Sequence, residues 1–158
     1  MLQLERQQKI LDYLKENRKA TTNELSELLG VSTTTIRTDL NQMDKEKLLK
    51  KLKEIIPDKK RIVAHDIPEK YLSDTLGRLK GEAAALVFPQ STEEVSKILK
   101  YAHKHGIPVT PRGAGTNLVG STVPVDGGII LDFSHMDKIL ELDENTMTIT
   151  VQPGLLLQ

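Results

Sequence analysis

The spacing of the apolar residues changes along this 158-residue chain, between Lys51 and His65. Before that point they recur every three or four residues, which indicates amphipathic helices. After it, apolar runs at 84–89, 107–111, 128–133 and 147–151 read as strands, and one helix is indicated at 91–106. Helices followed by alternating elements indicate two modules of an α+β protein. We expect three helices at 1–53, a linker or wing at 54–65, and a partial α/β module at 66–158.

The first module carries the signals of a helix-turn-helix. TTNE, from Thr21, is a capping box that opens a helix, and Gly30 ends that helix. Ser32 is then a preferred N-cap for a third helix that turns Ile36 toward the core. Its outward residues can reach phosphates and base edges: Thr33, Thr34, Thr35, Arg37, Thr38 and Asn41. A small helical bundle without DNA binding shows the same pattern, so the pattern alone leaves both open.

Residues 48–65 allow two interpretations. PDKK, at 57–60, could be the turn of a hairpin, forming a wing with lysines near the DNA backbone. Alternatively, the stretch LLKKLKEII continues as a helix. We favour the helix because the apolar residues keep helical spacing: Leu48, Leu49, Leu52, Ile55 and Ile56.

The stretch ERQQKILDYLKENRKATTNELSELLGVSTTTIRTDLNQMDKEKLLKK, at 5–51, resembles the DeoR-type winged helix-turn-helix of bacterial transcription regulators. ELSELLGVSTTTIRTDLNQM resembles the turn and recognition helix of that family. The resemblance implies that the protein reads two half-sites as a homodimer. It also implies DNA-facing roles for Ser32, Thr34, Thr35 and Arg37. Two departures predict a reduced affinity for DNA: Thr38 stands where a second Arg is common, and the Arg-x-His-Gly-Gly wing motif is missing.

A glycine-rich stretch, VTPRGAGTNLVG at 109–120, follows an apolar run in the second module. It is not a Walker A loop, because Ser121 occupies the position of the lysine. It is not a Rossmann fingerprint either, because Leu118 replaces the third glycine. Its amides could still converge on an anion, with Arg112, Thr116 and Asn117 as further donors. A plain surface loop between strands explains the glycines equally well.

Four segments in order, PQSTEEV, PRGAGTNLVG, GGIILDFSHMDKI and VQPG, break this tie. From about Asp66 onward the chain resembles the N-terminal part of the FAD-binding domain of the vanillyl-alcohol oxidase and p-cresol methylhydroxylase (PCMH) superfamily, closest to its glycolate oxidase and D-lactate dehydrogenase types. The resemblance implies that loop amides wrap the FAD pyrophosphate. FAD is expected to bind non-covalently, because Thr116 stands where related oxidases attach flavin through a His. The implied cofactor-binding residues are Pro89, Arg112, Gly113, Ala114, Gly115, Thr116, Asn117, Gly120, Ser121, Pro153 and Gly154.

In that family the FAD domain continues and a substrate domain follows, whereas this chain stops at Gln158. The four His residues offer no catalytic set, and we expect them to be exposed: His65, His103, His105 and His135. We therefore expect no complete catalytic site. Our interpretation is a transcription-regulator-like DNA-binding module fused to a truncated FAD-binding module. The alternative is the N-terminal fragment of an FAD-dependent 2-hydroxy-acid oxidoreductase.

Composition separates the two modules further. Residues 1–61 hold 14 Lys and Arg against 10 Asp and Glu, whereas residues 62–158 hold 8 against 12. A basic first part favours an anionic partner such as DNA. The absence of Cys excludes disulfides and thiolate metal sites, and no signal peptide or membrane span is recognisable, so we expect a cytoplasmic protein. MTITV, at 147–151, is expected to be an unpaired or weakly paired edge strand that favours dimerisation.

Overall fold

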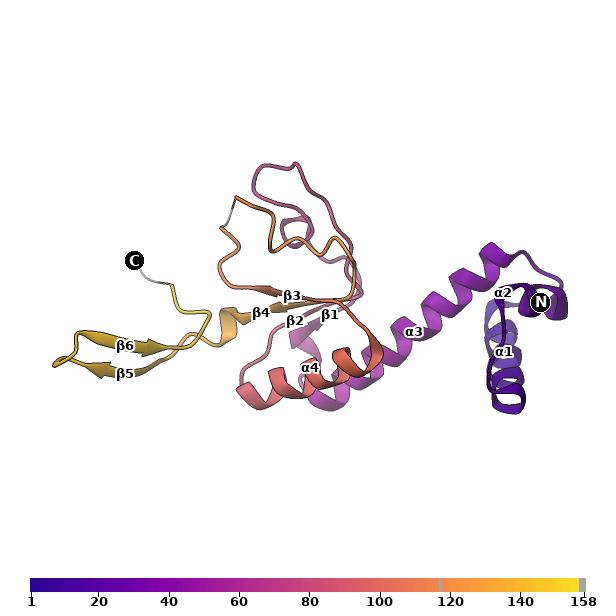
Figure 1. The fold of residues 1–158 in the computed structure, drawn as a ribbon, viewed down its shortest axis with the longest axis horizontal. Helices are drawn as coiled ribbons and strands as arrows, with labels where there is room; N and C mark the ends of the chain where they lie inside the picture. Colours follow the sequence, from indigo (N-terminus) through magenta and orange to yellow (C-terminus); the bar gives the residue numbers. More distant parts are fainter. Residues whose placement is uncertain (117, 157–158) are drawn as a thin grey trace. The chain divides into compact units, whose positions relative to one another are not determined.

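The computed structural model describes residues 1–116 and 118–156 (Figure 1). The chain divides into two compact units, Met1–Lys50 and Lys51–Gln158. Within the described residues, no helix is both long enough and apolar enough to cross a bilayer. The same part of the chain holds no group of three or more His, Asp or Glu side chains that could bind a metal ion. The functional boundaries at residues 53 and 66 stay a prediction.

The first unit is built from helices whose ends lie where the sequence indicates. α1 spans Gln3–Asn17, α2 spans Thr22–Leu29, and α3 begins at Thr33 and spans Thr33–Ile55. The capping box is confirmed, because Glu24 N donates to Thr21 Oγ1 at 3.2 Å and Thr21 N donates to the Glu24 carboxylate at 2.7 Å. Gly30 ends α2 in the left-handed conformation, with φ 64°. Thr35 N donates to Ser32 Oγ at 3.1 Å, which confirms Ser32 as the cap of α3.

α3 continues to Ile55, which confirms the prediction of a helix for LLKKLKEII and not the alternative of a hairpin wing. Pro57 then follows, and a proline cannot extend the helix. A 3-10 turn, η1, spans Lys59–Arg61, and strand β1 spans Ile62–Val63. β1 pairs with strand β2, Ala85–Val87, so the last part of the predicted linker contributes to the sheet of the second unit.

The core of the first unit joins its three helices. Ile10 of α1, Leu25 of α2 and Ile36 of α3 are at most 2% exposed. Complete burial of such a side chain stabilises a protein by about 1.5–3 kcal/mol. Around them lie partly buried apolar residues: Tyr13, Leu14, Ala20, Leu29, Val31, Leu40 and Met43.

A buried ion pair also joins α1 to α3. Arg6 Nε donates to Asp39 Oδ2 at 2.7 Å, and Arg6 Nη2 donates to Asp39 Oδ1 at 3.2 Å. The Asp39 side chain is 1% exposed, and the hydrogen bonds to it raise the pKa of Arg6. This two-point contact fixes the rotation of α3 about its own axis, which decides the face that α3 turns to solvent.

The second unit contains a four-stranded sheet in the order β1-β2-β4-β3. β2 spans Ala85–Val87, β3 spans Val109–Arg112 and β4 spans Ile129–Asp132. Both β2 and β3 run parallel to β4, and β1 is antiparallel to β2. The predicted strand–helix–strand unit therefore has β4 inserted between its two strands. The residues of β2 and β4 are all buried, as expected for central strands.

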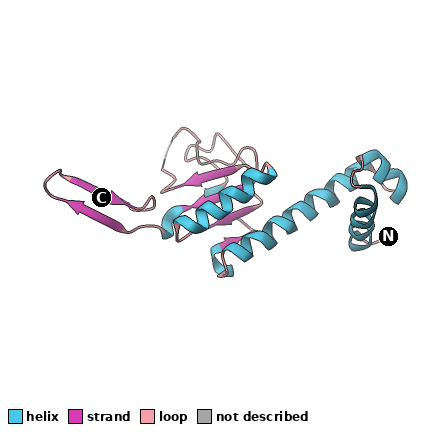
Figure 2. Ribbon diagram, turned by 60° about the horizontal axis from the view of Figure 1, so that its bottom comes forward, coloured by secondary structure: helices cyan, strands magenta, loops and turns pink. Residues whose placement is uncertain are grey.

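Helix α4, Thr92–His105, covers one face of this sheet (Figure 2). Glu94 N donates to the Ser91 cap, and Gly106 ends the helix with φ 62°, as the sequence indicates. Ile98 and Ala102 face the core and are at most 2% exposed. Two further 3-10 turns are present. η2, Glu69–Tyr71, lies between β1 and β2 in the sequence, and η3, Phe133–His135, directly follows β4.

The last described element of the second unit is a hairpin. β5 spans Ile139–Asp143 and pairs with β6, Thr148–Val151, in an antiparallel ribbon. The turn at 143–146 joins the two strands, and Asp143 accepts hydrogen bonds there from Asn145 N and from Thr146. MTITV is therefore paired on one side by β5, and it remains an edge strand because this sheet has two strands. Most of the ribbon is exposed, including the side chains of Ile139, Leu140, Leu142, Met147 and Ile149.

Candidate functional site

The polar face of α3 is the first candidate site. Of the residues predicted to meet DNA, Ser32, Thr34, Arg37, Thr38 and Asn41 are exposed, whereas Thr33 and Thr35 are half-buried. The Ser32 and Thr35 hydroxyls lie 3.0 Å apart at the cap, and Thr38 Oγ1 donates to Thr34 O at 3.1 Å. In the described part of the chain, the side chains of Arg37 and Asn41 make no hydrogen bond. These two residues therefore have donors available for a ligand.

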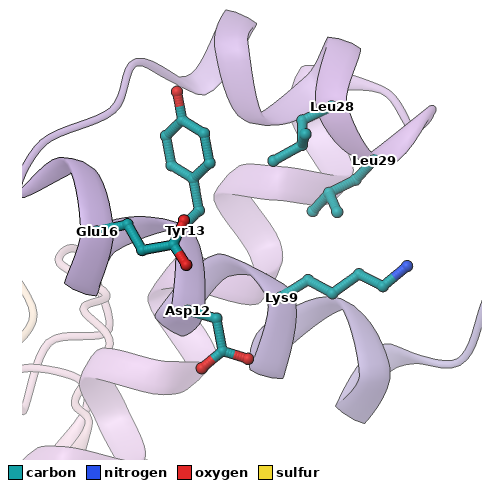
Figure 3. A pocket seen from close by; sticks show the side chains of 6 residues that line it. All are labelled: Lys9, Asp12, Tyr13, Glu16, Leu28 and Leu29. Atoms are coloured by element: carbon teal, nitrogen blue, oxygen red, sulfur yellow. The ribbon is translucent and has the colours of Figure 1, made fainter.

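A shallow groove between α1 and α2 is a different kind of surface (Figure 3). Its volume is about 270 Å³, and its lining residues are Lys9, Asp12, Tyr13, Glu16, Leu28 and Leu29. Hydrogen bonds from Gln8 and Lys15 lower the pKa of Asp12, which keeps this carboxylate charged. Two carboxylates on the wall disfavour a phosphate ligand, so we do not assign this groove to DNA.

The second candidate site lies at the carboxyl edge of the parallel strands β2, β4 and β3. In open α/β sheets, ligands bind outside this edge. Pro89 is buried and follows β2, and the loop 113–121 follows β3. The structure brings Gly113 close to the VQPG segment, because a Cβ built on Gly113 would lie 3.6 Å from Pro153 O. Gly154 N donates to Met136 O at 2.8 Å, which fixes this segment beside the end of β4.

The side chain of Arg112 lies against the glycine loop, next to Gly115. It is 8% exposed, although it is charged. Its guanidinium lies 5.1 Å from the centre of the Tyr71 ring, and its Nη1 donates to Thr122 Oγ1 at 3.4 Å. Gly115 has φ 71°, and a Cβ on it would overlap this guanidinium. Only a glycine therefore lets the chain close over Arg112 at this point.

The rest of the loop is open to solvent or faces other elements. Gly113, Ala114, Thr116 and Ser121 are exposed, and Gly115 is half-buried. Gly120 is buried with φ 71°, and a Cβ there would overlap the Leu79 side chain. Asn117 was predicted as a further donor, and it lies outside the described residues. The direct roles of these residues toward a cofactor stay predictions.

Aromatic contacts that sequence reasoning missed lie beside the same edge. Phe88, directly after β2, meets Tyr71 edge to face at 6.3 Å and stacks on His135 at 5.2 Å. His135 is exposed, as predicted, and so are the other three His residues. Tyr71, Phe88 and His135 lie far apart in the sequence, so no local pattern signalled these contacts.

A second ion pair anchors α4 at this edge. Arg61 Nη1 and Nη2 donate to the Glu94 carboxylate at 2.8 and 2.9 Å, and Arg61 Nη1 also donates to Phe88 O at 3.2 Å. Gln90 N donates to Glu94 Oε2 at 2.8 Å. The Arg61 contact and this backbone bond lower the pKa of Glu94. The pair holds the chain between β2 and α4 in place, and with it the position of Pro89.

These features fit a diphosphate. Residues 113–116 offer backbone amides without large side chains, two glycines of the loop adopt φ 71°, and the loop follows the carboxyl end of a parallel strand. Exposed Thr116 and Ser121 provide hydroxyl donors on the same loop. No Lys lies within the loop, so charge compensation would rest on Arg112 and on amide dipoles.

Comparison with known proteins finds a family model for each of the two parts of the chain. Residues 6–53 match the family model of the DeoR-like helix-turn-helix domain, and residues 83–158 match that of the FAD binding domain. The chain is 44% identical over 86 residues to glycolate oxidase subunit GlcD of Bacillus subtilis, covering 54% of this chain and 18% of that protein. It is 38% identical over 111 residues to D-lactate dehydrogenase of Anaerostipes hadrus, covering 70% and 23%.

Solved structures give the same result for the fold. p-Cresol methylhydroxylase with substrate bound matches with a TM-score of 0.62 and 25% identity, over 72% of this chain and 23% of that chain. Alkyldihydroxyacetonephosphate synthase matches with a TM-score of 0.60 and 25% identity, over 70% and 24%. This chain thus spans about a fifth to a quarter of the relatives it matches. The chain thus combines a match to the DeoR-like helix-turn-helix domain at residues 6–53 with a match to the FAD binding domain at residues 83–158.

Proposed function

We propose that this chain is a transcription-regulator-like DNA-binding protein whose second domain binds FAD non-covalently. The observation that supports DNA binding most strongly is the orientation of α3. Ile36 and Asp39 are at most 1% exposed and hold one face of the helix against α1 and α2. The opposite face carries Arg37 and Asn41, whose donors are available to phosphates and base edges.

DNA binding is tested with Arg37→Ala in a fluorescence anisotropy titration, after the preferred duplex has been selected from a random pool. Loss of a guanidinium contact to a base or phosphate is expected to weaken binding by about 1–3 kcal/mol, or roughly 5- to 150-fold. Lys15→Ala is the matched control, because it removes one positive charge from an exposed position on α1. Equal affinities of the Arg37→Ala variant and the wild type would remove α3 from the DNA interface.

For FAD, the proposed binding residues are those of the glycine loop and its neighbours. The amides of residues 113–116 and the hydroxyls of Thr116 and Ser121 would bind the pyrophosphate, while Arg112 would position the loop. Pro89, Pro153 and Gly154 would border the adenosine half, and Asn117 and Gly120 complete the set. Bound FAD supplies a ring that accepts or donates two electrons. This chain's own residues bind and orient it, and we propose that they do not form a complete catalytic site.

A second function is favoured by the relatives. The identity of 44% to a glycolate oxidase subunit supports the alternative that the chain is the N-terminal part of a flavin-dependent 2-hydroxy-acid oxidoreductase. The test is dye reduction by the FAD-loaded chain with glycolate or D-lactate. Turnover by this chain alone would favour the oxidoreductase and contradict our first proposal. We expect no turnover, because we propose that the residues of this chain do not form a complete catalytic site.

We also propose that the protein is a homodimer, and that it acts in the cytoplasm, where its DNA partner lies. A two-fold dimer would let two α3 helices read two half-sites. The exposed ribbon β5–β6 offers apolar surface for association, with Leu142 65% and Met147 89% exposed. Light scattering should give twice the chain mass, and Leu142→Thr should shift the protein toward monomer. A wild-type monomer at micromolar concentration would contradict the dimer.

A further inference from the structure

A basic cleft lies within the second unit, outside both sites described above. It has a volume of about 500 Å³ and is lined by residues of α4 and of the last turns of α3. Its lining residues are Lys51, Ile55, Lys97, Lys100, Tyr101, Lys104 and His105. None of these residues is acidic. Neither the glycine loop nor the polar face of the recognition helix shares a residue with it.

The lysines of α4 form one row. Positions 97, 100 and 104 share a face of the helix because they are three and four residues apart. All three are exposed, and within the described residues none of them makes an ion pair. Lys51 differs, because its Nζ lies 2.8 Å from the Glu54 carboxylate. Glu94, which lies one turn before Lys97, is paired with Arg61, and Lys97 adds a smaller electrostatic contribution that lowers the pKa of Glu94. The row therefore presents positive charge that no ion pair of the described residues neutralises, in a protein whose net charge is zero.

We propose that this basic cleft binds the phosphodiester backbone of DNA, as a second contact in addition to the helix-turn-helix. The inference rests on the proposed function, because it takes DNA as the partner. Lysine ammonium groups act as point charges toward phosphates and carry no base specificity. From residue 97 to residue 104 the helix rises about 10 Å. One strand of DNA carries about three phosphates over that length, so three lysines match three phosphates.

The aromatic residue of the cleft argues against a free nucleotide. Tyr101 lies against His105, with ring centres 4.4 Å apart and planes inclined by 43°. One face of the Tyr101 ring is therefore already covered by a neighbour on the same helix, which leaves less surface for a nucleobase to stack on. Exposed lysine ammonium groups along an open cleft can instead contact successive phosphates of a DNA strand that lies in the cleft.

The experiment compares the intact wild-type protein with Lys97→Gln/Lys100→Gln/Lys104→Gln. Binding to a fluorescein-labelled duplex of mixed sequence is measured by anisotropy between about 50 and 200 mM salt. The slope of log affinity against log salt is expected to become shallower by about 2 to 3, since each phosphate contact contributes about 0.9. The affinity near 0.1 M salt should fall about 100-fold. The matched control, Lys59→Gln/Lys60→Gln/Lys138→Gln, removes three exposed charges of the same unit away from the cleft and should change neither quantity.

An unchanged slope in the cleft variant, or an equal change in the control, would overturn the inference. Displacement of DNA by millimolar ATP from the wild type, but not from the cleft variant, would assign the cleft to a free phosphate ligand and would also overturn it. Arg37→Ala separates this inference from the proposed function. A slope that depends on the α4 lysines while Arg37→Ala has no effect would keep the cleft and reject the recognition helix; the reverse result would reject the cleft alone.

Discussion

A valine at position 115 tests how the glycine loop is held. Gly115 has φ 71°, and a non-glycine residue in this left-handed region costs about 1–2 kcal/mol. The added Cβ would also overlap the guanidinium of Arg112, with Nε only 2.6 Å away. Arg112 is 8% exposed and packed on Tyr71, so it cannot move without uncovering buried surface. Such overpacking costs a further 1–3 kcal/mol, approximately.

We therefore expect Gly115→Val to destabilise the second unit by about 3 kcal/mol. Its thermal midpoint should fall by about 10 °C or more. Displacement of the loop amides should weaken FAD binding at least about tenfold, which corresponds to about 1.4 kcal/mol. The assays are thermal unfolding by circular dichroism and quenching of flavin fluorescence during titration. Wild-type values in both assays would refute this account of the loop.

Gly113→Ala provides the matched comparison. A Cβ at this position would lie 3.6 Å from Pro153 O, which is an ordinary contact distance, so the fold should tolerate it. We expect an unchanged thermal midpoint. If the amide of Gly113 lies against the pyrophosphate, the methyl group should still weaken FAD binding. A variant that is stable and binds FAD as the wild type does would remove Gly113 from the proposed site.

Three further predictions concern the supports of the two sites. Asp39→Ala leaves Arg6 without its partner and should lower the thermal midpoint of the first unit by about 10 °C, measured by circular dichroism; no shift would show that the pair is dispensable. The lowered pKa of Glu94 means that its pairing with Arg61 stabilises the protein above the ordinary carboxyl pKa, near 4.3, and that this contribution is lost as pH falls through the lowered value. Urea unfolding of wild type and Glu94→Gln should therefore differ most at neutral pH and converge in acid; a constant difference would contradict this. Gly154→Ala should weaken FAD binding in the flavin titration, because its Cβ would overlap Phe133 O, and an unaffected variant would exclude this segment.

Local signals predicted most of the helices. The caps at Thr21, Ser32 and Ser91 and the glycines at 30 and 106 act within one turn of the backbone, so their effect can be read from adjacent residues. The strands at 85–87 and 129–132 were recognisable as runs of apolar residues. A central parallel strand has such a run because both of its faces are buried.

Long-range pairing was not predictable in the same way. The insertion of β4 between β2 and β3 depends on packing across the whole sheet, and no local pattern encodes strand order. The pairs Arg6–Asp39 and Arg61–Glu94 each join residues 33 positions apart. The support of Gly115 by Arg112 depends on a side-chain conformation, although both residues were singled out as candidates.

Fluorescence titration of FAD with the purified wild-type chain, together with its visible absorption spectrum, tests the central claim of the account most directly. We predict saturable quenching with one FAD per chain and a flavin absorption band that remains after gel filtration under conditions that keep the protein folded. No saturable binding by a folded chain would contradict the assignment of the loop 112–121 to FAD, and would leave DNA binding by the first 53 residues as the part of the proposal still to be tested.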